Sequence, residues 1–295
     1  MKDTDAGPGA AFRLVGIALN VSDLERSRAF YEHALGFACA GPVKTATPQQ
    51  ARLLGAPFHS QQMRIGNSHL ELTMFDGPTM PYPLDSRAND LWFQHFALLC
   101  LDVHAALLSL CDHDITPISQ GGPQTLPPHN GGITAYKFRD PDGHPLELFS
   151  LPNKPCHDQT KKGLFYGIDH SAISIRSTEA SILFYKKHVG LNIQDRQCNK
   201  GPRQDHLDGL HDVTVQVTAL ADKNPGMHLE LLDYKKPPGR TQGVPTHPTE
   251  RAASRLVFRA EDTSATPRSA PRHNDHPDAL LRDPDGHYLL LLQDV

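Results

Sequence analysis

Two stretches of the chain alternate apolar and polar positions, and a helical pattern follows each alternation. The first is "LVGIALNVSDLERSRAFYEHALGF" at 14–37, and the second is "IDHSAISIRSTEASILFYKKHVGL" at 168–191. The alternation predicts a half-buried strand at the start of each stretch. In the first stretch, Ser22 and Glu25 fit an S-x-x-E capping box, which would begin a helix. Gly36 lies where a glycine is expected to end that helix, so the pattern predicts a strand, a helix and then further strands.

These two stretches belong to a longer internal repeat. Tyr31 matches Tyr185, and Gly36 matches Gly190 at the same offset. Three further pairs of segments correspond: 69–75 with 228–234, 95–102 with 255–262, and 139–150 with 282–293. The last pair, "RDPDGHPLELFS" and "RDPDGHYLLLLQ", shares an Asp-Pro-Asp-Gly sequence that is typical of a turn between strands. The repeat therefore predicts an α+β fold of four units, each made of a strand, a helix and more strands.

The repeat divides the chain into two domains of two units each. The first domain is expected at 12–151, a polar linker at 152–164 and the second domain at 165–295. The fourth unit is truncated between its first strand and its final turn. Its segment "SATPRSAPRHNDHPDA" is too rich in proline to form the missing helix.

Composition and charge exclude several classes of function. The 295 residues carry a formal net charge of −4, and no basic stripe indicates nucleic-acid binding. Five cysteines occur without a C-x-x-C pair, which argues against a disulfide framework and against a thiolate zinc site. Neither a signal peptide nor a membrane-spanning apolar run is visible in the sequence. We therefore expect a cytoplasmic monomer or homodimer that acts on a small molecule and binds neither nucleic acid nor membrane.

The four units, with "FYEHALGF" at the end of the first helix and "DPDGHPLEL" near the end of the first domain, resemble the vicinal oxygen chelate superfamily. This superfamily includes glyoxalase I, methylmalonyl-CoA epimerase, extradiol dioxygenases and bleomycin-resistance proteins. The resemblance implies a tandem pair of domains, four βαβββ units, and a divalent metal held in a cup between two units. In glyoxalase I the ligand positions carry a His or Gln, a Glu, a His and a Glu. The matching positions here are Gly16, Glu71, His95 and Glu147 in the first domain, and His170, Glu230, Arg255 and Leu290 in the second.

Neither domain holds a full set of ligands, but the two deficits are complementary. Members of the superfamily often build a cup from units of different domains or subunits. If the second unit packs with the third, one cup receives four ligands: His95, Glu147, His170 and Glu230. The other cup then receives Gly16, Glu71, Arg255 and Leu290. We expect one live metal site and one dead site, where Arg255 either pairs with Glu71 or binds an anion. A buried carboxylate without a cation is costly, which explains a leucine at position 290.

Each proposed ligand also has a structural interpretation. Glu147 lies on an alternating strand and could face water. His95 could be a hydrogen-bonded histidine of the core, and His170 could lie at a solvated strand edge. His228 shares a strand face with Glu230 and could replace it as a ligand.

The resemblance implies a metal-dependent lyase or isomerase of the glyoxalase or epimerase type. A set of nitrogen and oxygen ligands without thiolates suits Ni, Co, Mn, Fe or Zn as the divalent metal. Such a metal can polarise a substrate oxygen, while Glu230 or Glu147 acts as the base at an adjacent C–H bond. His129 in "PPHNGG" could serve as an acid or base near the mouth of the site.

Two other functions remain open. If only His95, His170 and Glu147 bind the metal, the set becomes a triad of two histidines and one carboxylate. That triad suits an Fe(II) dioxygenase of the extradiol type, although Lys137 stands where those enzymes usually carry a tyrosine. The third possibility is a metal-free protein that binds a ligand, as bleomycin-resistance proteins do.

Overall fold

The structure is a computed structural model that describes residues 12–152, 163–241, 243–260 and 278–293. The first unit comprises β1 (Phe12–Asn20), α1 (Leu24–His33), β2 (Ala38–Cys39), β3 (Lys44–Thr45), α2 (Pro48–Leu54), β4 (Phe58–Ile65) and β5 (Ser68–Phe75). The second comprises β6 (Gln94–Cys100), α3 (Val103–Ser109), β7 (Thr116–Pro117), β8 (Gln124–Thr125), the 3-10 helix η1 (Pro128–Asn130), β9 (Thr134–Arg139) and β10 (Pro145–Ser150). The third comprises β11 (Phe165–Ile175), α4 (Thr178–Val189), β12 (Asn192–Lys200), α5 (Pro202–Asp208), β13 (Thr214–Ala221) and β14 (His228–Lys236). The fourth comprises β15 (Arg255–Ala260), β16 (Ala279–Arg282) and β17 (Tyr288–Leu292).

The predicted α+β fold with repeated units of this kind is confirmed. Two details of the prediction fall largely outside the described residues. The linker expected at 152–164 coincides mostly with 153–162, and the expected loss of a helix from the fourth unit concerns 261–277. In the part of the chain that is described, no helix is both long and apolar enough to cross a membrane.

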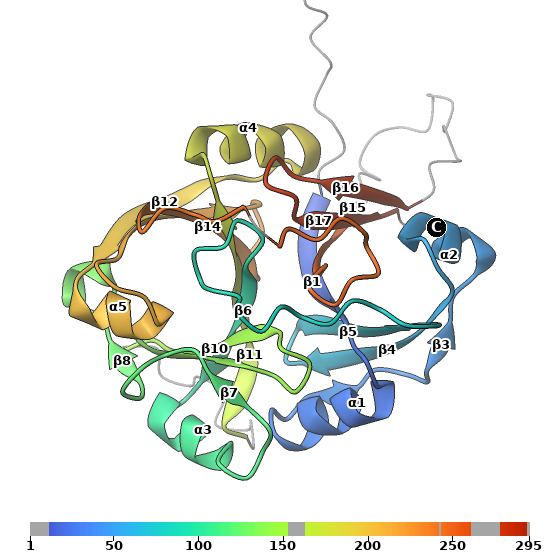
Figure 1. Ribbon diagram of the computed structural model, residues 1–295, viewed down its shortest axis with the longest axis horizontal. Helices are drawn as coiled ribbons and strands as arrows, with labels where there is room; N and C mark the ends of the chain where they lie inside the picture. Colours follow the sequence, from blue (N-terminus) through green and yellow to red (C-terminus); the bar gives the residue numbers. More distant parts are fainter. Residues whose placement is uncertain (1–11, 153–162, 242, 261–277, 294–295) are drawn as a thin grey trace, which may run out of the picture.

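The strands form two mixed sheets, and each sheet combines units from both halves of the chain (Figure 1). One sheet has the order β16-β17-β15-β1-β5-β4-β2, with β3 beside β4, and is called here the outer-unit sheet. The other has the order β12-β13-β14-β11-β6-β10-β9-β7, with β8 beside β9, and is called the inner-unit sheet. Strands β6 and β11 join the second and third units by antiparallel pairing, as β1 and β15 join the first and fourth. The predicted pairing of the second unit with the third is therefore confirmed.

The two largest apolar cores lie between units that are neighbours in sequence, whereas two smaller clusters join the second and third units of the inner-unit sheet. One core includes residues of the first and second units, among them Ile17, Leu70, Phe96 and Leu148. Another includes residues of the third and fourth units, among them Ile173, Tyr185, Leu256 and Leu289. Because side chains alternate along a strand, the face opposite each core is left for other side chains. The candidate site lies on that opposite face of the inner-unit sheet.

The helix α1 begins one residue later than the capping-box pattern predicts. Asp23 is the N-cap, and its carboxylate accepts a backbone hydrogen bond from the first turn. Ser22 instead donates its hydroxyl to Asp142 of the second unit at 2.6 Å. The predicted box of Ser22 and Glu25 was therefore wrong, because Asp is as good an N-cap as Ser and a tertiary contact engages Ser22. Gly36, which follows the helix, has φ +70°, as expected of a glycine at a helix end.

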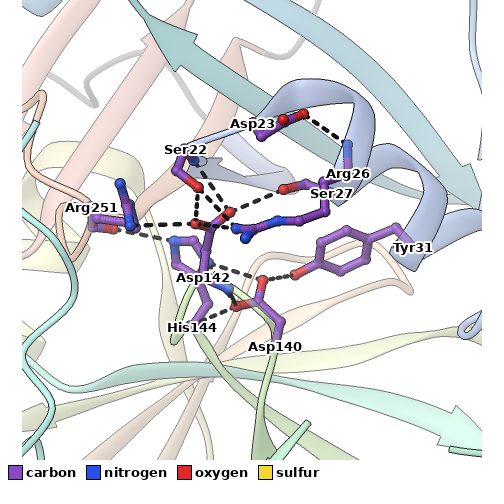
Figure 2. A network of polar contacts seen from close by, with 9 residues as sticks. All are labelled: Ser22, Asp23, Arg26, Ser27, Tyr31, Asp140, Asp142, His144 and Arg251. Carbon is purple, nitrogen blue, oxygen red and sulfur yellow. Dashed lines mark hydrogen bonds and ion pairs between the residues drawn. The ribbon is translucent and has the colours of Figure 1, made fainter. Parts of the chain in front are cut away.

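Each repeated Asp-Pro-Asp-Gly turn anchors the helix of the preceding unit. Asp140 accepts a hydrogen bond from the hydroxyl of Tyr31 at 2.8 Å, and Asp283 accepts one from Tyr185 at 3.0 Å. Both aspartates also accept backbone N–H groups of their own turn. Figure 2 shows the first turn, where Asp142 is surrounded by further donors: Ser22, Arg26, Ser27 and Arg251. The turn thus connects two units of a domain, and this role needs no metal.

Two short helices that the apolar pattern did not indicate pack on strands of a different unit. Helix α2 of the first unit packs on β16 of the fourth, and α5 of the third unit packs on β8 and β9 of the second. Helix α5 ends at Gly209, which has φ +63° and approaches the second unit so closely that a Cβ would lie 2.5 Å from the carbonyl oxygen of Ile118. This close contact places Asp208, the last residue of α5, against the inner-unit sheet.

Candidate metal centre

Four side chains converge on the face of the inner-unit sheet that is opposite the two largest apolar cores. Nε2 of His95 lies 3.1 Å from Oε2 of Glu147, and Nε2 of His170 lies 3.4 Å from the same oxygen. Nε2 of His170 also lies 3.6 Å from Oε2 of Glu230. The structure thus brings together all four residues that the sequence proposed as ligands. Among the described residues, two groups of three have ligand atoms that all lie within 4.8 Å of one another: His95, Glu147 and His170, which are buried, and Asp169, His170 and His228. Glu230 belongs to neither group and adjoins the first through its contact with His170.

The register of the sheet explains why these residues meet. One row across five strands reads His228, His170, Ala97, Glu147 and Lys137. The adjacent row reads Glu230, Ala172 and His95. Residues that are paired across strands share a face of the sheet, so both rows point to the same side. The two small alanines leave space between the larger polar side chains.

A β-bulge places a second carboxylate behind one of the imidazoles. The register of β11 against β6 shifts between Ile168 and His170, so Asp169 is the extra residue. A bulge redirects a side chain, and here Oδ2 of Asp169 lies 3.1 Å from Nδ1 of His170. Histidines that bind metals usually donate their second ring nitrogen to such a carboxylate. The contact therefore leaves Nε2 of His170 as the nitrogen that faces the cluster.

The spacing of the donor atoms fits a divalent metal. Ligand atoms at about 2.1 Å from a metal lie roughly 3.0–3.4 Å apart when they are neighbours in an octahedron or tetrahedron. The separations of 3.1, 3.4 and 3.6 Å are close to this range. Within the described part of the chain, Nε2 of His170 is buried and forms no hydrogen bond, although it faces two carboxylates. A buried nitrogen aimed at carboxylates without bonding to them is the arrangement that a shared cation would complete.

The electrostatics of the cluster keep both glutamates ionised. Burial alone would raise the pKa of Glu147, but the Lys137 ammonium and the imidazoles of His170 and His95 hold it well below its ordinary value. Burial likewise opposes ionisation of Glu230, yet the two neighbouring imidazoles lower its pKa. The pKa of His170 is raised well above its ordinary value against the effect of burial, chiefly by the Glu230 and Asp169 carboxylates. Three carboxylates thus face two cationic groups, and a divalent metal could replace the proton of His170 and offset the excess negative charge.

The structure separates the roles that the sequence left open for Glu230 and His228. Glu230 directs Oε2 toward His170, whereas Nε2 of His228 lies 3.6 Å from Oε1, the other oxygen of Glu230. His228 also lies 3.9 Å from Oδ2 of Asp169 and belongs to the second candidate group, with Asp169 and His170. Its ring packs against that of His170 at a centroid distance of 5.3 Å. Of the two, Glu230 is the better candidate ligand.

His129 is placed differently from the four proposed ligands. It lies in η1, and its side chain is exposed to solvent, whereas His95, Glu147 and His170 are buried. The neighbouring Asn130 anchors η1 by a hydrogen bond to Asn199 of β12 at 2.7 Å. A catalytic role for His129 stays a prediction.

A buried ion pair that the sequence analysis did not identify borders the cluster. Nζ of Lys137 lies 2.7 Å from Oδ1 of Asp208, and both side chains are almost completely inaccessible. The amide of Gln204 donates to the other oxygen of Asp208. Burial and the Asp208 carboxylate raise the pKa of the Tyr234 hydroxyl well above its ordinary value. The only signal in the sequence was a lysine within an otherwise apolar strand, and nothing in the local sequence pointed to Asp208 as its partner.

The equivalent face of the outer-unit sheet carries no comparable ligand set among the described residues. Arg255 is fully buried and donates to Asn20 at 2.6 Å and to Thr73 at 2.9 Å. Thr73 in turn donates to Glu71, and the charge of Glu71 acts on Arg255. At Gly16 a Cβ would lie 2.6 Å from a backbone oxygen of β5, so no other side chain fits without a shift of the backbone. A cavity of about 1300 Å³ lies over these positions, lined in part by Gly16, Glu71 and Leu290.

Comparisons with known proteins agree with this architecture. Residues 13–148 match the family model described as the Glyoxalase/Bleomycin resistance protein/Dioxygenase superfamily. Glyoxalase I from Zea mays is 18% identical, with 96% of this chain and 92% of that chain covered and a TM-score of 0.60. A mutant of the same maize enzyme gives the same identity and coverage with a TM-score of 0.63. A putative dioxygenase from Bacillus subtilis is 12% identical over 97% of this chain and 86% of that chain, with a TM-score of 0.53. No curated protein matches. At these identities the solved structures establish a shared fold, which hosts more than one chemistry.

Proposed function

We propose that the chain is a member of the Glyoxalase/Bleomycin resistance protein/Dioxygenase superfamily, whose family model matches residues 13–148, and that it is a metal-dependent lyase or isomerase of the glyoxalase or epimerase type. Its one active site lies on the inner-unit sheet, and the ligands are His95, Glu147, His170 and Glu230. The observation that carries the proposal is the convergence of two imidazole nitrogens and two carboxylate oxygens at 3.1–3.6 Å in a buried position. The substrate is a small oxygenated molecule.

The two glutamates differ in ways that suit different roles. A bound divalent metal would act as a Lewis acid and stabilise negative charge on a substrate oxygen. The side chain of Glu147 is 5% exposed and is held by Lys137 and two imidazoles, so it remains an ionised, fixed ligand. The side chain of Glu230 is 20% exposed and has fewer cationic partners, so it can move away and accept a proton from a C–H bond. Glu230 is therefore the preferred base.

A metal titration and a proton-exchange assay together test this proposal. The purified protein should bind close to one equivalent of Co(II), Ni(II), Mn(II), Fe(II) or Zn(II). It should then exchange the hydrogen next to the carbonyl of an α-hydroxycarbonyl compound with solvent deuterium. Glu230→Gln should slow the exchange by at least about 100-fold while a metal remains bound. A protein that holds no metal and gains no thermal stability from any of these ions would point to the third alternative, a metal-free binding protein.

An Fe(II) dioxygenase of the extradiol type is the second candidate. It is favoured by the composition of the buried group of His95, Glu147 and His170, which has two histidines and one carboxylate. An anaerobic assay separates the two enzymes, because a lyase or isomerase turns over without oxygen and a dioxygenase does not. Lys137 in place of the usual tyrosine speaks for the lyase or isomerase.

A further inference from the structure

Lys137 is a buried ammonium group beside the candidate metal centre, but it is not one of the proposed ligands. It lies on β9 directly opposite Glu147 of β10, so both side chains point to the same face of the sheet. The charge of Lys137 acts on Glu147, on Glu230 and on His95. A lysine is almost never buried without a reason, since its charge must be compensated.

The outer-unit sheet shows that the fold itself does not require this lysine. In that sheet the row equivalent to Lys137, Glu147, Ala97, His170 and His228 reads Leu280, Leu290, Val257, Gly16 and His69. Leu280 therefore stands in the place of Lys137, and it packs against an apolar cluster at α2. In this row, glycine and leucine replace the candidate ligands His170 and Glu147, and an apolar residue also replaces the lysine. The lysine therefore occurs in the sheet that carries the candidate ligands, and the arrangement of the strands does not itself require it.

The charges around the site explain what a buried ammonium group can contribute. A divalent ion with two carboxylate and two neutral imidazole ligands is neutral overall. Lys137 and Asp208 compensate each other, and the 2.7 Å contact to Asp208 occupies one of the three N–H donors of Lys137. The Asp169 carboxylate behind His170 adds a further negative charge. The remaining N–H donors of the Lys137 ammonium can therefore bind an anionic oxygen in a site that would otherwise repel it.

We propose that Lys137 binds an anionic oxygen of the substrate next to the metal. The substrate is then a small molecule in which one of the oxygens that approach the metal belongs to a carboxylate or an enolate. Asp208 of α5 positions the ammonium group for this contact. The inference rests on the proposed function, because it assumes a metal at His95, Glu147, His170 and Glu230. It extends that function by naming the charge of the substrate and the residue that selects it.

Oxalate binding to the Mn(II)- or Co(II)-loaded protein tests the inference, with calorimetry for the affinity and the Co(II) absorption spectrum for the coordination. The wild-type protein should bind oxalate, and Lys137→Met should bind it about 10- to 100-fold more weakly at unchanged metal affinity. Lys236→Met is the matched control, because Lys236 also pairs with an aspartate, at 2.8 Å, but is exposed. It should bind oxalate as the wild type does.

A double variant separates contact with the anion from a purely structural role. Lys137→Met leaves Asp208 buried without its cation, whereas Lys137→Met with Asp208→Asn removes both charges. If Lys137 only compensates Asp208, the double variant should recover oxalate binding, and that recovery would overturn the inference. Equal oxalate affinity in wild type and Lys137→Met, or a metal-loaded wild type that does not bind oxalate, would also overturn it while leaving the metal centre intact. A wild-type protein that binds no divalent ion would instead overturn the proposed function and the inference together.

Discussion

The inner-unit and outer-unit sheets have the same register, yet equivalent positions carry different chemistry. His170 corresponds to Gly16, and both follow a shift in register of the first strand of their unit. Glu147 corresponds to Leu290, and Ala172, between Glu230 and His95, corresponds to Ala18, between Glu71 and Arg255. One sheet presents a set of nitrogen and oxygen donors, and the other presents an arginine with its own hydrogen-bond partners.

This difference shows how the residues of a candidate metal position can be replaced without a change of fold. The positive charge of Arg255 lowers the pKa of Glu71, although burial still holds that pKa above its ordinary value. Leu290 is buried and contributes apolar contacts where a glutamate would need a partner. The turns and the Tyr–Asp contacts are kept in both halves because they connect units within a domain. The two sheets therefore share the same fold, but among the described residues the inner-unit sheet alone carries the candidate set of metal ligands.

Removal of His170 should have the largest effect on this comparison. His170→Ala deletes one of the buried nitrogen ligands of the inner-unit sheet, so metal binding should be lost, with an affinity at least about 1000-fold weaker. Inductively coupled plasma mass spectrometry and calorimetry measure the loss. Glu71→Gln is the control in the outer-unit sheet and should leave metal binding unchanged. If Glu71→Gln lost the metal while His170→Ala kept it, the metal would lie in the outer-unit sheet, and our proposal would be wrong.

Replacement of the arginine in the outer-unit sheet should have the next largest effect, but on stability. Arg255→Met leaves Glu71 without its cation and leaves Asn20 and Thr73 without their donor, so unfolding free energy should fall by roughly 3–5 kcal/mol. Urea denaturation measures the change. Arg259→Met on the same strand is exposed and should change stability by no more than about 0.5 kcal/mol. An equal effect of the two variants would mean that Arg255 does not replace a cation.

Loss of the carboxylate behind His170 should weaken metal binding without abolishing it. Asp169→Asn keeps the shape of the side chain, but the amide no longer fixes the ring nitrogen of His170 as the carboxylate does. Metal affinity should fall by about 10- to 100-fold, as measured by competition with a chelator of known affinity. Val15→Asn changes the equivalent bulge position of the outer-unit sheet and should have no effect on the metal. A normal affinity in Asp169→Asn would show that the bulge does not serve the site.

The candidate ligands could be proposed from the sequence because the internal repeat and the alternation along strands are visible there. Glu147 lies between two leucines of an alternating strand, and the alignment of the repeats drew attention to His95 and His170. The contact between Lys137 and Asp208 could not be predicted in this way, since it joins the second unit to a short helix of the third. Its existence depends on how α5 packs on strands of the second unit.

Two smaller features escaped the sequence for different physical reasons. The bulge at Asp169 is a shift of one residue in pairing, which side-chain alternation does not specify where polar residues such as Asp169, His170 and Ser171 follow one another. The start of α1 was misplaced because Ser22 and Asp23 are both good N-caps, and only the distant Asp142 decides between them. In each case a tertiary contact selected between local alternatives of similar energy.

Metal binding should strengthen as pH rises, by up to about tenfold per pH unit. In the metal-free protein the pKa of His170 is raised well above 6.5, so the folded state holds a proton there that a metal must displace. The stability that this proton contributes is present below pH 6.5 and is lost as pH rises through the folded pKa. Calorimetry in buffers of different ionisation enthalpy should show proton release on metal binding near neutral pH. A pH-independent affinity would show that His170 is already neutral. In the outer-unit sheet the equivalent position is Gly16, which has no side chain to titrate.

The smallest effects should come from the contacts that the two halves share. Tyr31→Phe removes the hydrogen bond to Asp140, and Tyr185→Phe removes the one to Asp283. Each aspartate keeps backbone donors of its turn, so each change should lower the unfolding free energy by only about 1 kcal/mol, and neither should alter metal binding. Chemical denaturation with and without Co(II) measures both quantities. If Tyr31→Phe weakened metal binding as well, the first turn would support the candidate metal site in addition to the fold. The two halves of the chain would then differ in the role of their Tyr–Asp hydrogen bonds as well as in their metal-binding side chains.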